Sequence, residues 1–294
     1  MRVFVTGATG FIGSAIVREL ISAGHRVAGL VRSDDKAAAL EAIGAEAELG
    51  SLEDHDGLRE AAARSDAVIH TAFNHDFSKF VENCENDRRV IETLSSAVAG
   101  SVRPLIVTSG VAVGGAQPGR PLTEEDRPLM SSISPRAASE EAAYDAVAKG
   151  VNVSVVRLPQ VHDTVRHGLV TYAIATAREK GVAAYVGDGT QRWPAAHVHD
   201  VARLYRLALE QCKSGAVWHA VAEEGLRLRE IAEAIGRRFE LPVASIGPAE
   251  AEAYFGWLAA FASHDAPAVS QRTQRELGWH PAGPGLIADI EASR

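Results

Sequence analysis

The sequence predicts an α/β fold: a doubly wound parallel sheet with a smaller, discontinuous C-terminal lobe. Short apolar runs such as RVFVTG, DAVIHTA and PLIVTSG alternate with amphipathic stretches such as IVRELISAG and RRVIETLSSAVAG. Strands that are apolar throughout and alternate with helices indicate a parallel sheet covered on both faces. After about residue 160 the alternation loosens into Gly-rich turns, two further helical stretches and a tail that contains Pro and Gly.

Composition and charge exclude several classes of protein. The chain has 294 residues, of which 46% are apolar and 23% charged, so it is long enough to bury a sizeable core. Its net charge is −8, and no cluster of basic residues could follow a phosphate backbone, so we expect no nucleic acid partner. Cys84 and Cys212 lie far apart, which indicates neither a disulfide framework nor a zinc site. Without a leader-like start or a long apolar run, we expect a cytoplasmic protein with no membrane partner.

The segment VFVTGATGFIGSAIVREL places Gly7, Gly10 and Gly13 between a predicted strand and a predicted helix. In such a turn the glycines allow a sharp bend, and the helix N-terminus presents free N–H groups to a pyrophosphate. A glycine pattern alone is weak evidence, but here the strand before, the helix after and a second strand are all present. The turn therefore predicts a dinucleotide cofactor.

The end of the second predicted strand, GLVRSDDK, indicates which dinucleotide binds. An acidic residue at this place hydrogen-bonds the ribose 2′-OH of NAD, whereas an arginine pairs with the 2′-phosphate of NADP. Arg32 comes first here, with Ser33 and Lys36 close enough to assist. We therefore expect NADP(H) in preference to NAD(H); in the alternative, Arg32 is a solvated surface charge and Asp34 or Asp35 binds the ribose.

Six segments of the chain resemble a known family. They are TGATGFIG, SDAVIHTAF, VTSGVAVGG, PLTEEDRP, VSVVRLPQVHD and GDGTQRWPAAHVHDVARL. Up to about residue 212 they follow, in order, the landmarks of the extended short-chain dehydrogenase/reductases, the NAD(P)-dependent epimerase/dehydratase group. This resemblance implies a Rossmann domain of residues 1–158 plus about 196–220, and a substrate lobe of about 159–195 plus 221–294.

The same resemblance implies a set of residues around the cofactor. Ser51 stands where the family usually has Asp before Leu, which loosens the expected adenine contact, and Leu158 stands before Pro159 where the family usually has Arg-Pro. The implied cofactor residues, beyond those at the end of the second strand, are Gly7, Gly10, Phe11, Ile12, Gly13, Ser51, Leu52, Thr71, Ala72, Phe73, Arg136 and Pro159.

The reactive Tyr-x-x-x-Lys pair of the family is replaced in this chain. Counting back from Glu140, the tyrosine falls on Ser132 and the lysine on Arg136. The sequence thus resembles the atypical members of the family, and Ser109 matches the family's catalytic Ser or Thr. Arg136 can hold a ribose and polarise an oxygen, but a guanidinium does not release a proton at neutral pH.

The proton must then come from another group. His75 follows the fourth predicted strand and His162 follows the sixth, in the loops where this fold carries its sites. An imidazole has a suitable pKa for proton transfer near neutrality, so both histidines are candidate acids. Two alternatives stay open: water held by Ser109 supplies the proton, or each histidine is an ordinary polar loop residue.

The substrate side is indicated by Trp193, which stands where nucleotide-sugar enzymes of the family carry a diphosphate-binding arginine. An indole there favours an apolar or aromatic substrate, and Ser132 is expected on the same side. Alternatively Trp193 is a core residue, and a slip of one residue would return Arg192 to the phosphate role. His197-x-His199 alternates on a predicted strand, so we expect no metal site.

Together these features predict an NADP(H)-dependent oxidoreductase that transfers a hydride to or from a small or medium apolar or aromatic carbonyl or imine compound. The missing Tyr/Lys pair leaves a second hypothesis, an NADP(H)-binding sensor or regulatory protein without chemistry. A nucleotide-sugar epimerase or dehydratase is a third and lesser one. The resemblance also implies a homodimer formed by helices from about 85 to 99 and 137 to 149.

Overall fold

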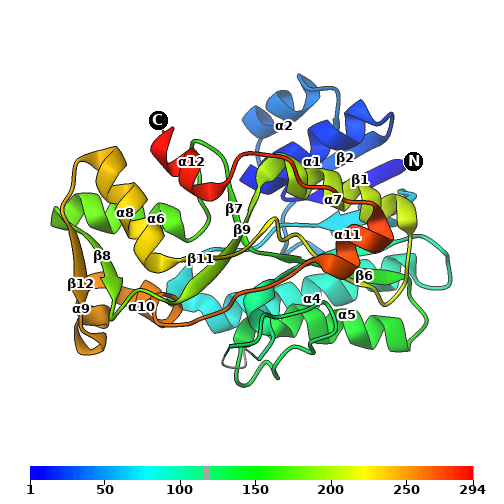
Figure 1. Cartoon of the computed structure of the whole chain (residues 1–294). Coiled ribbons are helices and arrows are strands. Elements are labelled where there is room, and N and C mark those ends of the chain that lie inside the picture. The colour runs from blue at the N-terminus through cyan, green and yellow to red at the C-terminus, as the bar shows by residue number, and fades with distance from the viewer. Residues whose placement is uncertain (116–118, 294) are drawn as a thin grey trace.

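Seven parallel strands form the main sheet of the computed structural model, which describes residues 1–115 and 119–293. Their order, β10-β6-β5-β4-β1-β2-β3, reverses direction between β1 and β4, which is the switch point where open α/β sheets bind ligands in a crevice at the carboxyl edge. The predicted fold class is confirmed (Figure 1). The strands are β1 (Arg2–Thr6), β2 (Arg26–Val31), β3 (Glu46–Leu49), β4 (Ala67–His70), β5 (Leu105–Gly110), β6 (Val153–Leu158) and β10 (Val217–His219).

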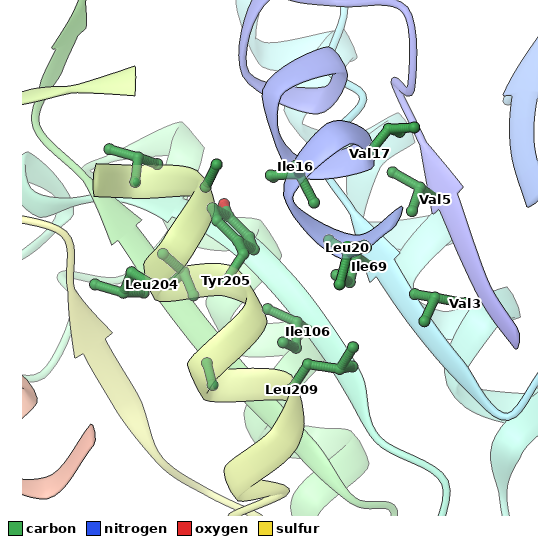
Figure 2. Close-up of a cluster of buried hydrophobic side chains, with 14 of the residues drawn as sticks. Val3, Val5, Ile16, Val17, Leu20, Ile69, Ile106, Leu204, Tyr205 and Leu209 are labelled. Atoms are coloured by element: carbon green, nitrogen blue, oxygen red, sulfur yellow. The ribbon is translucent and has the colours of Figure 1, made fainter. Parts of the chain in front are cut away.

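Helices cover both faces of this sheet because its strands bury side chains alternately on each side. Val3 and Val5 of β1 pack in one apolar cluster, while Phe4 between them belongs to another. Figure 2 shows the first cluster between the sheet and two helices. The helices on this face are α1 (Phe11–Ser22), α2 (Asp34–Glu41) and α7 (Val198–Gln211), and those on the other are α3 (His55–Ala63), α4 (Phe80–Val98) and α5 (Ala138–Ala148).

The smaller lobe has two short sheets and a core of its own. One sheet has the order β11-β9-β7, and the other pairs β12 with β8. Its strands are β7 (Gln160–His162), β8 (Ala183–Val186), β9 (Arg192–His197), β11 (Glu223–Arg227) and β12 (Val243–Ile246). Its helices are α6 (Val170–Lys180), α8 (Leu228–Phe239), α9 (Ala251–Phe255), α10 (Ala259–Ala262) and α12 (Leu286–Glu291), and 3-10 turns lie at η4 (Pro248–Glu250) and η5 (Gly256–Leu258).

The last part of the chain returns to the large sheet before it ends. Leu277, at the end of α11 (Gln271–Leu277), and Trp279 pack in the cluster beneath the large sheet, and the indole N–H of Trp279 donates to the carbonyl of Asp200 at 2.8 Å. The predicted division at residue 221 stays a prediction. This packing argues for assigning α11 to the cofactor domain.

A buried ion pair fixes α5 against the sheet. Arg157 of β6 donates to both carboxylate oxygens of Glu140, at 2.8 and 2.7 Å, and neither side chain is exposed. Burial, followed by the nearby Arg157 cation, lowers the pKa of His219 to about 4. Because Glu140 is the residue from which positions 132 and 136 were counted, this pair anchors the helix that carries the candidate site.

Helices α4 and α5 lie side by side along one face of the sheet (Figure 1). Arg88 of α4 pairs with Glu141 of α5 at 2.5 Å, which ties the two helices together. The predicted pairing of these helices across a twofold axis stays a prediction. No helix within residues 1–115 and 119–293 is both long and apolar enough to cross a bilayer.

Candidate functional site

The glycine turn joins β1 to α1 at the carboxyl edge of the sheet. Gly7 has φ +71°, a left-handed conformation that favours glycine, and a Cβ on Gly13 would lie 2.0 Å from the Gly7 carbonyl oxygen. Gly10 caps α1 without a side-chain hydrogen bond, and the first turn of the helix has no acidic residue. Free N–H groups and an uncompensated positive helix end are what a pyrophosphate requires. The turn therefore fits a dinucleotide, with Phe11 and Ile12 partly buried behind it.

The residues expected around the adenosine half lie at the ends of β2 and β3. Arg32, Ser33 and Lys36 are all exposed beside one another, at the start of α2. Asp34 and Asp35 occupy the first turn of the same helix and are exposed too, so the preference for NADP(H) over NAD(H) stays a prediction. The two residues expected at the adenine, Ser51 and Leu52, follow β3 and are partly buried. Ser51 Oγ accepts a hydrogen bond from the Glu53 backbone at 3.3 Å.

A buried polar network lies beneath the crevice and includes two residues that the sequence did not single out. His70, the last residue of β4, contacts Thr6 Oγ1 through Nδ1 at 2.7 Å and Asp87 Oδ1 through Nε2 at 2.9 Å. Asp87 comes from α4, and only 2% of its side chain is exposed. The network therefore brings a carboxylate and an imidazole from separate elements to the carboxyl edge of β1 and β4.

Arg136 joins this network from η3 (Pro135–Ala137), directly before α5. Its Nη1 donates to Asp87 Oδ2 at 2.8 Å and to the hydroxyl of Ser139, while Nη2 donates to the Thr108 carbonyl at 2.9 Å. Its guanidinium also lies over the Phe73 ring, 4.3 Å from the centroid. Burial alone would raise the pKa of Asp87, but the charges of Arg136 and His70 outweigh it and hold the pKa at about 2. The cation at position 136 is thus oriented and paired.

Ser109, near the end of β5, directly follows the residue whose carbonyl accepts from this cation. Thr108, the residue before it, bonds to the His70 carbonyl at 2.7 Å and to the Tyr205 hydroxyl at 2.6 Å, where burial raises the pKa of the tyrosine. Ser109 is 3% exposed, and within the described residues its Oγ has no hydrogen-bond partner. A buried hydroxyl without a partner costs free energy unless a ligand or water binds it.

The loop after β4 places His75 beside Arg136. The imidazole meets the Phe73 ring edge-on at 5.3 Å between centroids and lies 6.1 Å from the Phe77 ring, while the residue stays exposed on its other side. Desolvation, and then the charge of Arg136, lower the pKa of His75. Thr71 and Ala72 of the same loop are partly buried, and Thr71 Oγ1 donates to the Thr6 carbonyl at 2.7 Å.

His162 belongs to a different group of residues. It is completely buried in β7, where its Nδ1 contacts Asp289 Oδ2 of α12 at 2.6 Å and its ring lies 5.8 Å from that of His197. Desolvation lowers the pKa of His162, although Asp289 opposes the shift. The structure therefore does not bring His162 and His75 together, and its role as the acid stays a prediction.

The residues expected on the substrate side are spread over both lobes. Trp193 is 5% exposed in the core of the small lobe, and its indole N–H donates to the Phe261 carbonyl at 3.2 Å. Its neighbour Arg192 pairs with Asp265 at 2.8 Å. Ser132 is exposed in the loop before η3, and Pro159 is partly buried after β6. The substrate role of Trp193 stays a prediction.

No group of three or more metal-binding side chains converges anywhere in the described parts of the chain. His197 Nδ1 accepts from the His199 backbone at 3.3 Å, so His197 caps the N-terminus of α7. Asp200 accepts from the backbone of Ala282 and Gly283. The expected absence of a metal stays a prediction.

Comparison with known proteins shows one family over most of the chain. The model of the NAD dependent epimerase/dehydratase family matches residues 3–221. An uncharacterized protein of Schizosaccharomyces pombe is 46% identical over 99% of this chain and 98% of its own length. The 4-hydroxy-2-methyl-3-oxo-4-farnesyl-3,4-dihydroquinoline-1-oxide ketoreductase of Stigmatella aurantiaca is 29% identical over 95% of this chain and 92% of that protein. The dTDP-glucose 4,6-dehydratase of Streptomyces venezuelae, solved with NAD, shares the fold with a TM-score of 0.80 at 19% identity, over 99% of this chain and 96% of that one.

The Asp87 pair predicts a specific dependence of stability on pH. Because the pKa of Asp87 falls from an ordinary 3.8 to about 2 on folding, its ionised form stabilises the protein above about pH 4, and this contribution is lost as the pH falls toward 2. Asp87→Asn should cost about 2 kcal/mol of this pH-linked stability at about pH 6, and about half of that difference should disappear by about pH 3.

Urea unfolding of both proteins across that range measures the difference. Asp56→Asn, in the exposed pair with Arg59, is the control and should change stability by less than about 1 kcal/mol at every pH. A difference between wild type and Asp87→Asn that stays constant down to about pH 3 would contradict this account of the network.

Proposed function

Because the chain belongs to the NAD dependent epimerase/dehydratase family, we propose that it is an NADP(H)-dependent oxidoreductase acting on a small or medium carbonyl or imine compound. The observation that carries this proposal is the buried hydroxyl of Ser109, which has no hydrogen-bond partner among the described residues and directly follows Thr108, whose carbonyl accepts from the fixed cation of Arg136. Reduction of a carbonyl needs such a donor at its oxygen, and the relative from Stigmatella aurantiaca is named as a ketoreductase.

In the proposed function, the cofactor binds along the carboxyl edge of the sheet. In the proposal, the N-terminus of α1 holds the pyrophosphate, and Arg32 with Ser33 and Lys36 holds the 2′-phosphate. Arg136, oriented by Asp87, faces the ribose on the nicotinamide side and replaces the family's lysine in that role. The cofactor supplies the hydride or accepts it.

The chain's own residues then bind the substrate oxygen and move the proton. Ser109 donates a hydrogen bond to the carbonyl oxygen, and His75 gives it a proton as the hydride reaches the carbon, so that the carbonyl becomes an alcohol and the cofactor is oxidised. The C–H and O–H bonds formed are balanced by three bonds broken: the π bond of the carbonyl, the C–H bond of the reduced nicotinamide that would give the hydride, and the N–H bond of the His75 imidazolium, which is left neutral. Water held by Ser109 is the alternative proton source, since solvent reaches the exposed side of the loop that carries His75.

A cofactor-binding sensor is the second candidate. The observation that favours it is the absence of the Tyr/Lys pair, with exposed Ser132 in the tyrosine's place. Tight NADPH binding without turnover of any carbonyl compound would support the sensor. Nucleotide-sugar chemistry is a lesser candidate, because Arg192, the residue that could grip a diphosphate, is paired with Asp265.

Arg32 predicts selectivity between the two cofactors. At about one hundred times its Kd, NADPH should stabilise the protein by about 2.7 kcal/mol, which raises the Tm by about 5 °C, and NADH at the same concentration should raise it much less. Arg32→Ala should remove this difference, whereas Arg59→Ala on α3 should keep it. Thermal unfolding with the four oxidised and reduced cofactors tests the expectation; equal stabilisation by NADH and NADPH in the wild type would refute it.

His75 predicts the pH dependence of the reduction. Because the pKa of His75 lies below the ordinary 6.5, its imidazole is mainly neutral at neutral pH, and kcat/KM for NADPH-dependent reduction should rise as the pH falls through that lowered pKa. His75→Gln should abolish this rise and lower turnover about a hundredfold.

NADPH oxidation with a panel of ketones, aldehydes and imines, corrected for acid decay of the cofactor, measures the profile. His199→Gln is the matched control, since His199 is exposed on α7, and it should leave the profile unchanged. An unaltered profile in His75→Gln would assign the proton to water at Ser109 instead.

A further inference from the structure

Two aromatic side chains connect the cofactor domain to the small lobe at the site. Phe77 lies in η1 (Phe77–Lys79), in the loop after β4, and Trp257 lies in η5 of the small lobe. Their rings stack face to face, 4.1 Å apart between centroids at an angle of 12°. Tyr172 of α6 meets both rings edge-on, at 5.1 Å from Trp257 and 6.3 Å from Phe77. We call Phe77, Tyr172 and Trp257 the aromatic bridge; Figure 1 shows the cyan segment before α4 close to the orange α9–α10 region.

The aromatic bridge is continuous with the catalytic residues of the proposed function. Phe77 stacks on Phe80 at 5.7 Å, and Phe80 meets Phe73 at 6.3 Å. Phe73 in turn lies beneath the guanidinium of Arg136. The imidazole of His75 lies between Phe73 and Phe77. An apolar ring bound at the bridge would therefore have its polar end near the cation and the imidazole.

The bridge also leaves an unusual amount of aromatic surface exposed. Trp257 and Tyr172 are each 42% exposed, whereas the other three tryptophans of the chain are 5% exposed or less. Exposed aromatic area is unfavourable in water and is typical of a binding surface, because flat rings stack with little loss of side-chain entropy. The exposed rings are thus suited to a flat, uncharged ligand.

We propose that the aromatic bridge is the substrate's ring subsite, so that the compounds this chain converts are aryl carbonyl compounds, with the aromatic ring on Phe77, Tyr172 and Trp257 and the C=O at Ser109 and His75. This assignment rests on the proposed function. It replaces Trp193, which lies in the lobe core, with Trp257 as the tryptophan that recognises the substrate.

A matched pair of ketones tests this subsite. Acetophenone and cyclohexyl methyl ketone have nearly the same size and apolarity, but only the first has a flat aromatic ring. Wild type should prefer acetophenone about tenfold in kcat/KM, which is equivalent to about 1.4 kcal/mol and lies near the upper end of what aromatic stacking contributes beyond area burial. Trp257→Ala should remove this preference by raising KM for acetophenone about tenfold, with kcat and the KM for NADPH nearly unchanged.

Two further variants separate recognition from folding. Trp257→Phe keeps a flat ring and should retain most of the preference, while Val243→Ala removes an exposed apolar side chain elsewhere in the small lobe and should change nothing. Equal losses on both ketones in Trp257→Ala, or a wild type that does not distinguish the two, would overturn the subsite while leaving the proposed function intact.

A binding measurement decides the case in which neither ketone is reduced. Because Trp257 is the exposed tryptophan, acrylamide should quench its fluorescence in wild type, and acetophenone added with NADP should protect it. Cyclohexyl methyl ketone should protect much less, and Trp257→Phe should show no ligand-dependent protection. Protection without turnover would leave the subsite standing and count against the oxidoreductase; absence of protection would overturn the subsite.

Discussion

The candidate site depends on a buried carboxylate that holds a cation at the edge of the sheet. Asp87 reaches from α4 to the end of β4 and binds both His70 and Arg136, so one side chain fixes three elements. A guanidinium with only 19% of its surface exposed is costly without a counter-charge, and Asp87 supplies it at 2.8 Å. With Arg136 fixed, its contacts to the Thr108 carbonyl and the Phe73 ring follow, and these set the positions of Ser109 and of the loop that carries His75.

Much of this arrangement could be predicted from the sequence, because it depends on local patterns. Apolar strands that alternate with helices predicted the sheet, which is confirmed, and counting from Glu140 located the cation at position 136; the phosphate site at the glycine turn stays a prediction. Asp87 could not be found in this way, since the run CENDRR resembles a solvated helix face and its burial depends on partners distant in the sequence. The tryptophans present the same difficulty: spacing does not distinguish Trp193, buried in the lobe, from Trp257, exposed at the aromatic bridge.

In the proposed function, the site differs from that of a Tyr/Lys enzyme in where its charge and its proton lie. Arg136 in place of a lysine has a positive charge but no proton that it can transfer at neutral pH, and the ion pair with Asp87 partly neutralises that charge. Proton transfer would then fall to His75, on a neighbouring loop. The same loop carries Phe77, which contacts Trp257 of the small lobe, so one segment would serve both proton transfer and substrate recognition.

Isotope transfer tests the central claim, that this site moves a hydride, most directly. The protein is incubated with acetophenone or benzaldehyde and NADPH that carries deuterium on one face of the reactive carbon, and in a second experiment on the other face. Mass spectrometry then measures the deuterium content of the product alcohols. The account predicts deuterium in the alcohol from one face only, formed at least about tenfold more slowly by Ser109→Ala. Alcohols without deuterium from either face, or no alcohol at all from a protein that binds NADPH, would contradict it.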